Sequence, residues 1–131
     1  QRDLKGYKIG PHRDNLDKLF SVMFYTPTVK MTNELEQDHG TALCIPKFEN
    51  PENYPQHPDH VGSGSSRHFR FEDVKIIKTA PAKANTLFSW AVSEKSYHGV
   101  TSLESEEVRS TIAYFAKTPK HLKNKHVLWK E

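Results

Sequence analysis

The sequence predicts a mainly β domain of the β-sandwich or β-barrel type, with few short helices. Its apolar residues occur in short strand-like runs broken by turn residues, and no segment has the pattern of a long amphipathic helix. The length of 131 residues fits one domain, and a hydrophobic share of 35% fits a thin core between sheets with much polar loop. We therefore expect residues 1–131 to form a single domain.

Six short runs are expected to form strands. They are rich in β-branched and aromatic residues, or alternate with polar ones, and turn residues separate them. The runs are Phe20–Tyr25, Thr41–Ile45, His68–Phe71, Val74–Ile77, Thr86–Val92 and Ser110–Phe115. Leu103–Val108 is expected to be a polar loop or one helical turn.

One long segment, residues 48–66, departs from this pattern. Three prolines and two glycines interrupt it, so it cannot continue a ladder of hydrogen bonds. A loop of this length in a compact domain often covers a binding site. We therefore expect residues 48–66 to form a lid.

Charge and composition exclude several classes. One cysteine, Cys44, excludes an intramolecular disulfide and a Cys-based zinc finger. The net charge is only +3, and the excess lies largely in residues 117–131, which we expect to be a solvated basic tail; the alternative is a module that binds nucleic-acid phosphates. No stretch approaches the roughly 18 apolar residues of a membrane span, and no signal peptide is visible. We expect a cytoplasmic protein without a membrane partner.

Histidine is abundant, with eight copies. Five of these histidines are expected to be surface or capping residues, namely His39, His57, His60, His121 and His126. The spacing of His57 and His60 occurs in some metal sites, but no third ligand follows with a regular spacing.

His12 and Asp14 form the first part of a candidate metal site. On an extended chain, residues i and i+2 point the same way, and a nitrogen–oxygen pair suits a divalent first-row metal. His98 is expected to begin an aromatic-flanked turn after a strand, and two histidines with one carboxylate make the facial triad of non-haem iron oxygenases. Arg109 begins a later strand, and no protein acid is obviously assigned to it. A bound carboxylate would be its natural partner.

The chain resembles the Fe(II)- and 2-oxoglutarate-dependent dioxygenases, especially the prolyl-4-hydroxylase-like branch. The order His-x-Asp, distant His and Arg carries the resemblance, together with the segments Gly6–Asp14, Ser21–Tyr25, Tyr97–Val100 and Arg109–Ile112. It spans residues 6–116 and implies a double-stranded β-helix, which is a jelly roll of the cupin type. The family usually carries helices ahead of His-x-Asp. Since only eleven residues precede His12, we expect an excerpt or a minimal version that lacks the N-terminal helices.

The resemblance implies a role for each matching residue. The catalytic iron ligands would be His12, Asp14 and His98. The residues expected to line the co-substrate pocket are Arg109, Thr111, Tyr25, Met23 and Ser21. Arg109 would pair with the distal carboxylate of 2-oxoglutarate, which Thr111 and Tyr25 would also reach. Ser21 and Met23 are included because they share a strand face with Tyr25.

The implied activity is hydroxylation of an unidentified substrate with Fe(II), O2 and 2-oxoglutarate, releasing succinate and CO2, with ascorbate as a reductant. Halogenating relatives lack the carboxylate that Asp14 provides, so hydroxylation is expected. We favour a small-molecule substrate, because nothing indicates a peptide groove, and a peptidyl or nucleic-acid substrate remains open. The alternative class is a catalytically silent cupin-like domain that binds a metal.

Overall fold

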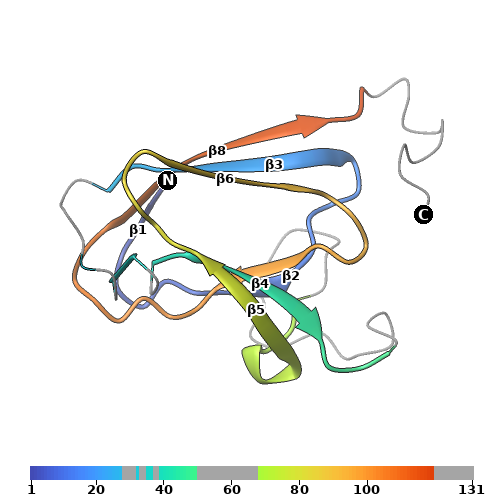
Figure 1. The fold of residues 1–131 in the computed structure, drawn as a ribbon, viewed down its shortest axis with the longest axis horizontal. Coiled ribbons are helices and arrows are strands. Elements are labelled where there is room, and N and C mark those ends of the chain that lie inside the picture. Colours follow the sequence, from blue (N-terminus) through green and yellow to red (C-terminus); the bar gives the residue numbers. More distant parts are fainter. Residues whose placement is uncertain (28–31, 33–34, 37–38, 50–67, 120–131) are drawn as a thin grey trace.

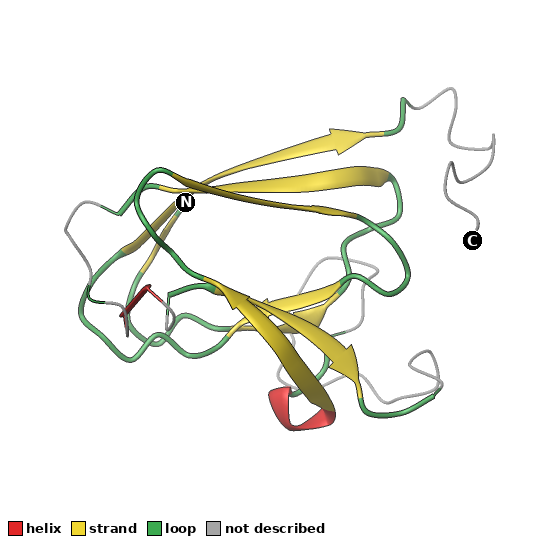
Figure 2. Ribbon diagram, in the orientation of Figure 1, coloured by secondary structure: helices red, strands yellow, loops and turns green. Residues whose placement is uncertain are grey.

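The computed structural model describes residues 1–27, 32, 35–36, 39–49 and 68–119. Within these residues the chain is mainly β, as predicted, and its eight strands form two four-stranded antiparallel sheets (Figures 1 and 2). Most of the expected lid at 48–66 and of the expected tail at 117–131 lies outside the described residues, as do His57, His60, His121 and His126. No helix in the described part is long and apolar enough to cross a membrane.

The first sheet has the strand order β1-β8-β3-β6 and lies above the second sheet in Figure 1. Its strands are β1 (Arg2–Asp3), β8 (Arg109–Lys117), β3 (Lys18–Tyr25) and β6 (Thr86–Ala91). The three longer strands coincide with predicted runs of aromatic and β-branched residues, which fit a half-buried pleated surface. Strand β1 was not expected.

The second sheet has the strand order β2-β7-β4-β5. Its strands are β2 (Ile9–His12), β7 (Tyr97–Val100), β4 (Thr41–Pro46) and β5 (Val74–Ala80). The face of this sheet that carries Cys44 and Tyr97 packs into an apolar cluster with Phe69. The site described below lies between the two sheets.

Two expectations about this second sheet are wrong. His68–Phe71 does not form a strand: His68 makes an isolated bridge to His12, and the 3-10 helix η2 (Phe71–Asp73) follows. Phe69 is 2% exposed, so this segment serves as an apolar cover rather than as a paired strand. His98 does not begin a turn, because it is the second residue of β7, whose four residues are all buried.

Strand β3 supplies the middle residue of three rows that cross the first sheet. These rows are Phe115–Ser21–Trp90, Ala113–Met23–Phe88 and Thr111–Tyr25–Thr86, here called the Ser21, Met23 and Tyr25 rows. The rows face the second sheet, since the Tyr25 hydroxyl bonds to Thr41 in β4. Successive rows are about 7 Å apart, because residues of one face are two strand positions apart.

The opposite face of the first sheet carries large apolar side chains that are between 42% and 60% exposed. They are Phe20, Phe24, Leu87, Ile112 and Tyr114. Apolar faces of this kind are typical of surfaces that another element or protein covers.

Gly99 lies where β2 and β7 approach closely, next to His98. A Cβ at this position would be 2.7 Å from the carbonyl oxygen of Ile9 and 3.0 Å from the nitrogen of Pro11. Because both atoms belong to the backbone, the strands would have to separate. We expect Gly99→Ala to lower the free energy of unfolding by about 1–3 kcal/mol, as overpacking does, and to weaken metal binding at His98. Thermal denaturation and metal titration measure this, and unchanged values for both would contradict it.

Candidate metal centre

The two histidines of the predicted triad come from neighbouring strands. His12 in β2 is directly opposite His98 in β7, and their ring centroids are 4.6 Å apart. Side chains directly opposite in an antiparallel pair lie on the same face of the sheet. Asp14 lies two residues beyond the end of β2, so the extended strand that was expected to carry both His12 and Asp14 stops at His12. One ligand atom from each of the three residues nevertheless lies within 4.8 Å of the others.

Backbone carbonyls orient both imidazole rings. His12 Nδ1 lies 3.0 Å from the carbonyl oxygen of Gly10, and His98 Nδ1 lies 3.1 Å from that of Ser96. A carbonyl oxygen only accepts hydrogen bonds, so each Nδ1 carries the proton and donates. Each Nε2 therefore keeps the lone pair that a metal ion needs, as in metal sites where a carbonyl fixes the histidine tautomer.

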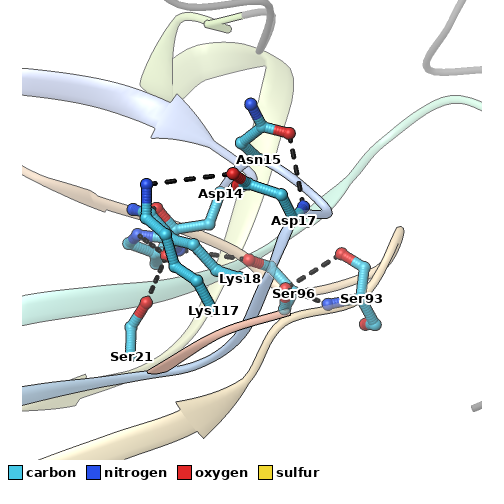
Figure 3. Close-up of polar contacts among 9 residues, drawn as sticks. Asp14, Asn15, Asp17, Lys18, Ser21, Ser93, Ser96 and Lys117 are labelled. Carbon is cyan, nitrogen blue, oxygen red and sulfur yellow. Dashed lines mark hydrogen bonds and ion pairs between the residues drawn. The ribbon is translucent and has the colours of Figure 1, made fainter. Parts of the chain in front are cut away.

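Two donors hold the Asp14 carboxylate (Figure 3). Ser21 Oγ donates to Oδ2 at 2.6 Å, and Lys18 Nζ donates to Oδ1 at 2.5 Å. Burial by itself would raise the pKa of Asp14, but the hydrogen bonds from Lys18 and Ser21, with His98 nearby, hold that pKa below its ordinary value. The group is therefore an anionic ligand at neutral pH.

Burial also keeps the two histidines neutral. It lowers the pKa of His12 to about 4, with a further contribution from the neighbouring His98 ring. The pKa of His98 is lowered as well, again chiefly by burial. Neutral imidazole is the form that binds metals, so the site needs no proton release from these rings at pH 7.

Metal binding is expected to persist on acidification from pH 7.5 to 5.5, because a His12 pKa of about 4 leaves little imidazolium in that range. The unfolded chain, with a histidine pKa of about 6.5, binds more protons than the folded chain below that pH. The free energy of unfolding of the metal-free protein should therefore fall as the pH falls from 6.5 towards 4. Co(II) titrations and denaturation across this range measure both effects. A midpoint of metal binding near pH 6.5 would contradict the expectation.

The donor set fits a divalent first-row metal. Two imidazole nitrogens and one carboxylate oxygen are typical of the 2-His-1-carboxylate triad. His98 Nε2 lies 3.9 Å from Asp14 Oδ2, so these side chains would have to draw closer together to hold one ion.

Two aromatic rings that were not assigned to the site from the sequence restrict the histidines. Trp90 in β6 lies with its ring 4.4 Å from that of His98, and His68 stacks on His12 at 4.3 Å with an interplanar angle of 2°. The indole nitrogen of Trp90 is buried and has no hydrogen-bond partner among the described residues.

Arg109 lies in a second polar cluster between the sheets. Its side chain is 2% exposed, Nη1 donates to Asp3, and Nε donates to the carbonyl oxygen of His39 at 2.7 Å. The expectation that no protein acid pairs with Arg109 is therefore wrong. The reason is β1, which brings Asp3 directly opposite Arg109. His39 was expected to be a surface or capping residue. It is fully buried, and its ring nitrogens lie 3.1 Å and 2.9 Å from the carbonyl oxygens of Leu35 and Glu107, so it caps backbone carbonyls and is not on the surface.

Tyr25 and Thr111 lie in the Tyr25 row, beside this cluster. The Tyr25 hydroxyl and Thr41 Oγ1 are 2.6 Å apart, and Arg109 Nη2 donates to the same Thr41 oxygen at 3.4 Å. Thr111 Oγ1 is buried and has no partner in the described part of the chain. Of the other residues expected to line a co-substrate pocket, Ser21 contacts the candidate ligand Asp14, and half-buried Met23 lies in the row between.

The distance between the two clusters follows from the register of the second sheet. Leu43 in β4 is directly opposite His98, and Thr41 lies two residues before Leu43. Two strand positions correspond to about 7 Å along the strand. Thr41, which contacts Arg109, therefore lies about two strand positions along β4 from the residue opposite His98.

This chain thus carries a nitrogen- and oxygen-donor triad, with Asp14 and His98 buried and His12 half-buried, and a cluster around the buried Arg109. No protein-family model, no curated protein and no solved structure matches the chain.

Proposed function

We propose that this chain is an Fe(II)- and 2-oxoglutarate-dependent oxygenase with a jelly-roll fold. The strand order supports the fold. One sheet contains the strands β1, β8, β3 and β6 and the other β2, β7, β4 and β5. Successive strands alternate between the sheets, except that β4 and β5 are paired neighbours in the same sheet. Eight strands in two facing antiparallel sheets are typical of jelly rolls and cupins.

The observation that carries the proposed activity is the triad of His12, Asp14 and His98. Both imidazoles present an unprotonated Nε2, and the carboxylate is charged and held by two donors. Three protein ligands on one side of a metal leave coordination positions for a co-substrate and for O2. A site built only for structure is usually closed by a fourth protein ligand, which is not found among the described residues.

The Arg109 cluster supports 2-oxoglutarate as the co-substrate. A guanidinium has five N–H donors, and the described contacts of Arg109 use three of them, to Asp3, His39 and Thr41. Two donors remain for a ligand carboxylate, and the unpartnered Thr111 hydroxyl adds a third. Planar carboxylates bind arginine in this way.

When bound, Fe(II) with O2 and 2-oxoglutarate supplies the oxidising chemistry that hydroxylates a substrate and yields succinate and CO2. The chain itself orients the metal ligands and the co-substrate and shields them from water. Carbonyls fix the two imidazoles, Ser21 and Lys18 fix Asp14, and Arg109 with Thr111 orients the distal carboxylate. The sheets bury the site and limit water. We propose a small molecule as substrate.

Succinate formation tests the proposal. Purified protein with Fe(II), ascorbate and 2-oxoglutarate is expected to convert 2-oxoglutarate to succinate, even when no substrate is present to be hydroxylated. His12→Ala is expected to remove this conversion. If the wild type and His12→Ala form the same background amount of succinate, the proposed oxygenase activity is wrong.

One observation favours the alternative of a silent metal-binding domain. Asp3 already neutralises Arg109, so a co-substrate carboxylate would share that arginine with a protein carboxylate. If metal binding depends on His12 but no succinate is formed, this alternative is the correct one.

A further inference from the structure

Lys18 is an unusual neighbour for a metal ligand. Its ammonium group lies 2.5 Å from Asp14 Oδ1, and its side chain is only 17% exposed. Lysine is seldom buried unless it is paired. By comparison, Lys117 lies 3.8 Å from Asp17 with a side chain that is 56% exposed, as is usual for a surface ion pair (Figure 3).

The Ser21 row fixes Lys18 and the triad together. Phe115 lies under the Lys18 ammonium, with 3.8 Å between Nζ and the ring centroid. Ser21 donates to Asp14, and Trp90 contacts His98. One cross-strand row thus supports the cation, the carboxylate and one imidazole, so Lys18 is a built part of the site. A cation over an aromatic face is attracted to it, most strongly where water is excluded.

The charges of the site give Lys18 a function. A divalent metal with Asp14 carries a net charge of +1, and Lys18 raises it to +2, which a dianionic ligand neutralises. Lys18 also competes with a metal for Asp14 and repels it, since like charges a few ångströms apart in a partly buried site repel strongly.

We propose that Lys18 is a positioning residue that trades metal affinity for affinity towards a dianionic second ligand, such as a 2-oxo dicarboxylate. The inference rests on the proposed function, because it requires a metal and a dicarboxylate at this site. By occupying Oδ1, Lys18 also restricts Asp14 to a single ligand oxygen, which leaves positions free for the second ligand.

Lys18→Met removes the charge at similar length and tests the inference in the full chain. Mn(II) titration is expected to show about tenfold tighter metal binding. Calorimetry with 2-oxoglutarate at saturating Mn(II) without O2 is expected to show about tenfold weaker binding of the dicarboxylate. Lys18→Arg keeps the charge and should stay near the wild type in both measurements. Lys117→Met, a charge removal in the neighbouring ion pair, should change neither constant, and circular dichroism verifies that each variant is folded.

Changes of opposite sign in the affinities for Mn(II) and for 2-oxoglutarate distinguish this role from a purely structural one. Weaker binding of both ligands by Lys18→Met would mean that Lys18 merely holds Asp14, and would overturn the inference, as would unchanged binding of both. A wild-type protein that binds no Mn(II) would overturn the proposed function together with this inference. A wild type that binds both ligands, without the opposite changes in Lys18→Met, would overturn the inference alone.

Discussion

Replacing Asp14 by asparagine is expected to abolish both tight metal binding and succinate formation. The amide has nearly the same size as the carboxylate, but it lacks the charge that balances a divalent ion and that Lys18 and Ser21 hold in place. Loss of a partner that merely orients a ligand typically costs 10- to 100-fold in metal affinity. Because Asp14 is itself a ligand, we expect a loss of more than about 100-fold, measured by Mn(II) or Co(II) titration.

Asp17→Asn is the matched control, because it removes a carboxylate from the same loop that is not part of the triad. This variant is expected to bind metal and form succinate as the wild type does. A metal affinity of Asp14→Asn within tenfold of the wild type would exclude Asp14 as a ligand, and equal losses in both variants would indicate a general effect of charge.

The longer strands could be predicted because their patterns are local. Phe20–Tyr25 and Thr86–Val92 contain enough β-branched and aromatic residues to identify β3 and β6. Strand β1 has two residues and β2 has the sequence Ile-Gly-Pro-His, so neither shows a period. The segment His68–Phe71 alternates as a strand would, but packing of its aromatic residues against the second sheet determines its structure. The order of strands in the sheets depends on pairing between distant residues, which a local pattern does not contain.

The part of the candidate site that could be predicted is the part that follows from the order of residues along the chain. The spacing of His12 and Asp14 and the resemblance to a family identified the triad, which the structure brings together. The neighbours that define its environment were missed, because strand register places them there. Trp90 reaches the site by lying opposite Ser21, and Lys18 by folding back along the loop onto Asp14. Asp3, at the start of the chain, gave no signal as the partner of Arg109.

Breaking the ion pair between Asp3 and Arg109 is expected to cause a large loss of stability. The two side chains are 3% and 2% exposed, so removing one partner leaves a buried charge without its counter-ion. Such changes typically cost about 3–5 kcal/mol. Arg109→Met and Asp3→Asn should each lower the free energy of unfolding by about this amount, measured by denaturant titration of the metal-free protein. Lys5→Met, which breaks an exposed pair with Glu106, should leave it nearly unchanged.

The same two variants determine whether Arg109 binds the co-substrate. In Asp3→Asn the guanidinium lacks its protein carboxylate, so a ligand carboxylate that reaches it restores a counter-ion. With Mn(II) present, 2-oxoglutarate should therefore raise the Tm of Asp3→Asn by more than that of the wild type. It should stabilise Arg109→Met least. The monocarboxylate 2-oxobutyrate can chelate the metal but lacks the distal carboxylate, and it should raise all three Tm values equally. If 2-oxoglutarate behaves like 2-oxobutyrate in Asp3→Asn, then Arg109 serves the fold through Asp3 and does not bind the co-substrate.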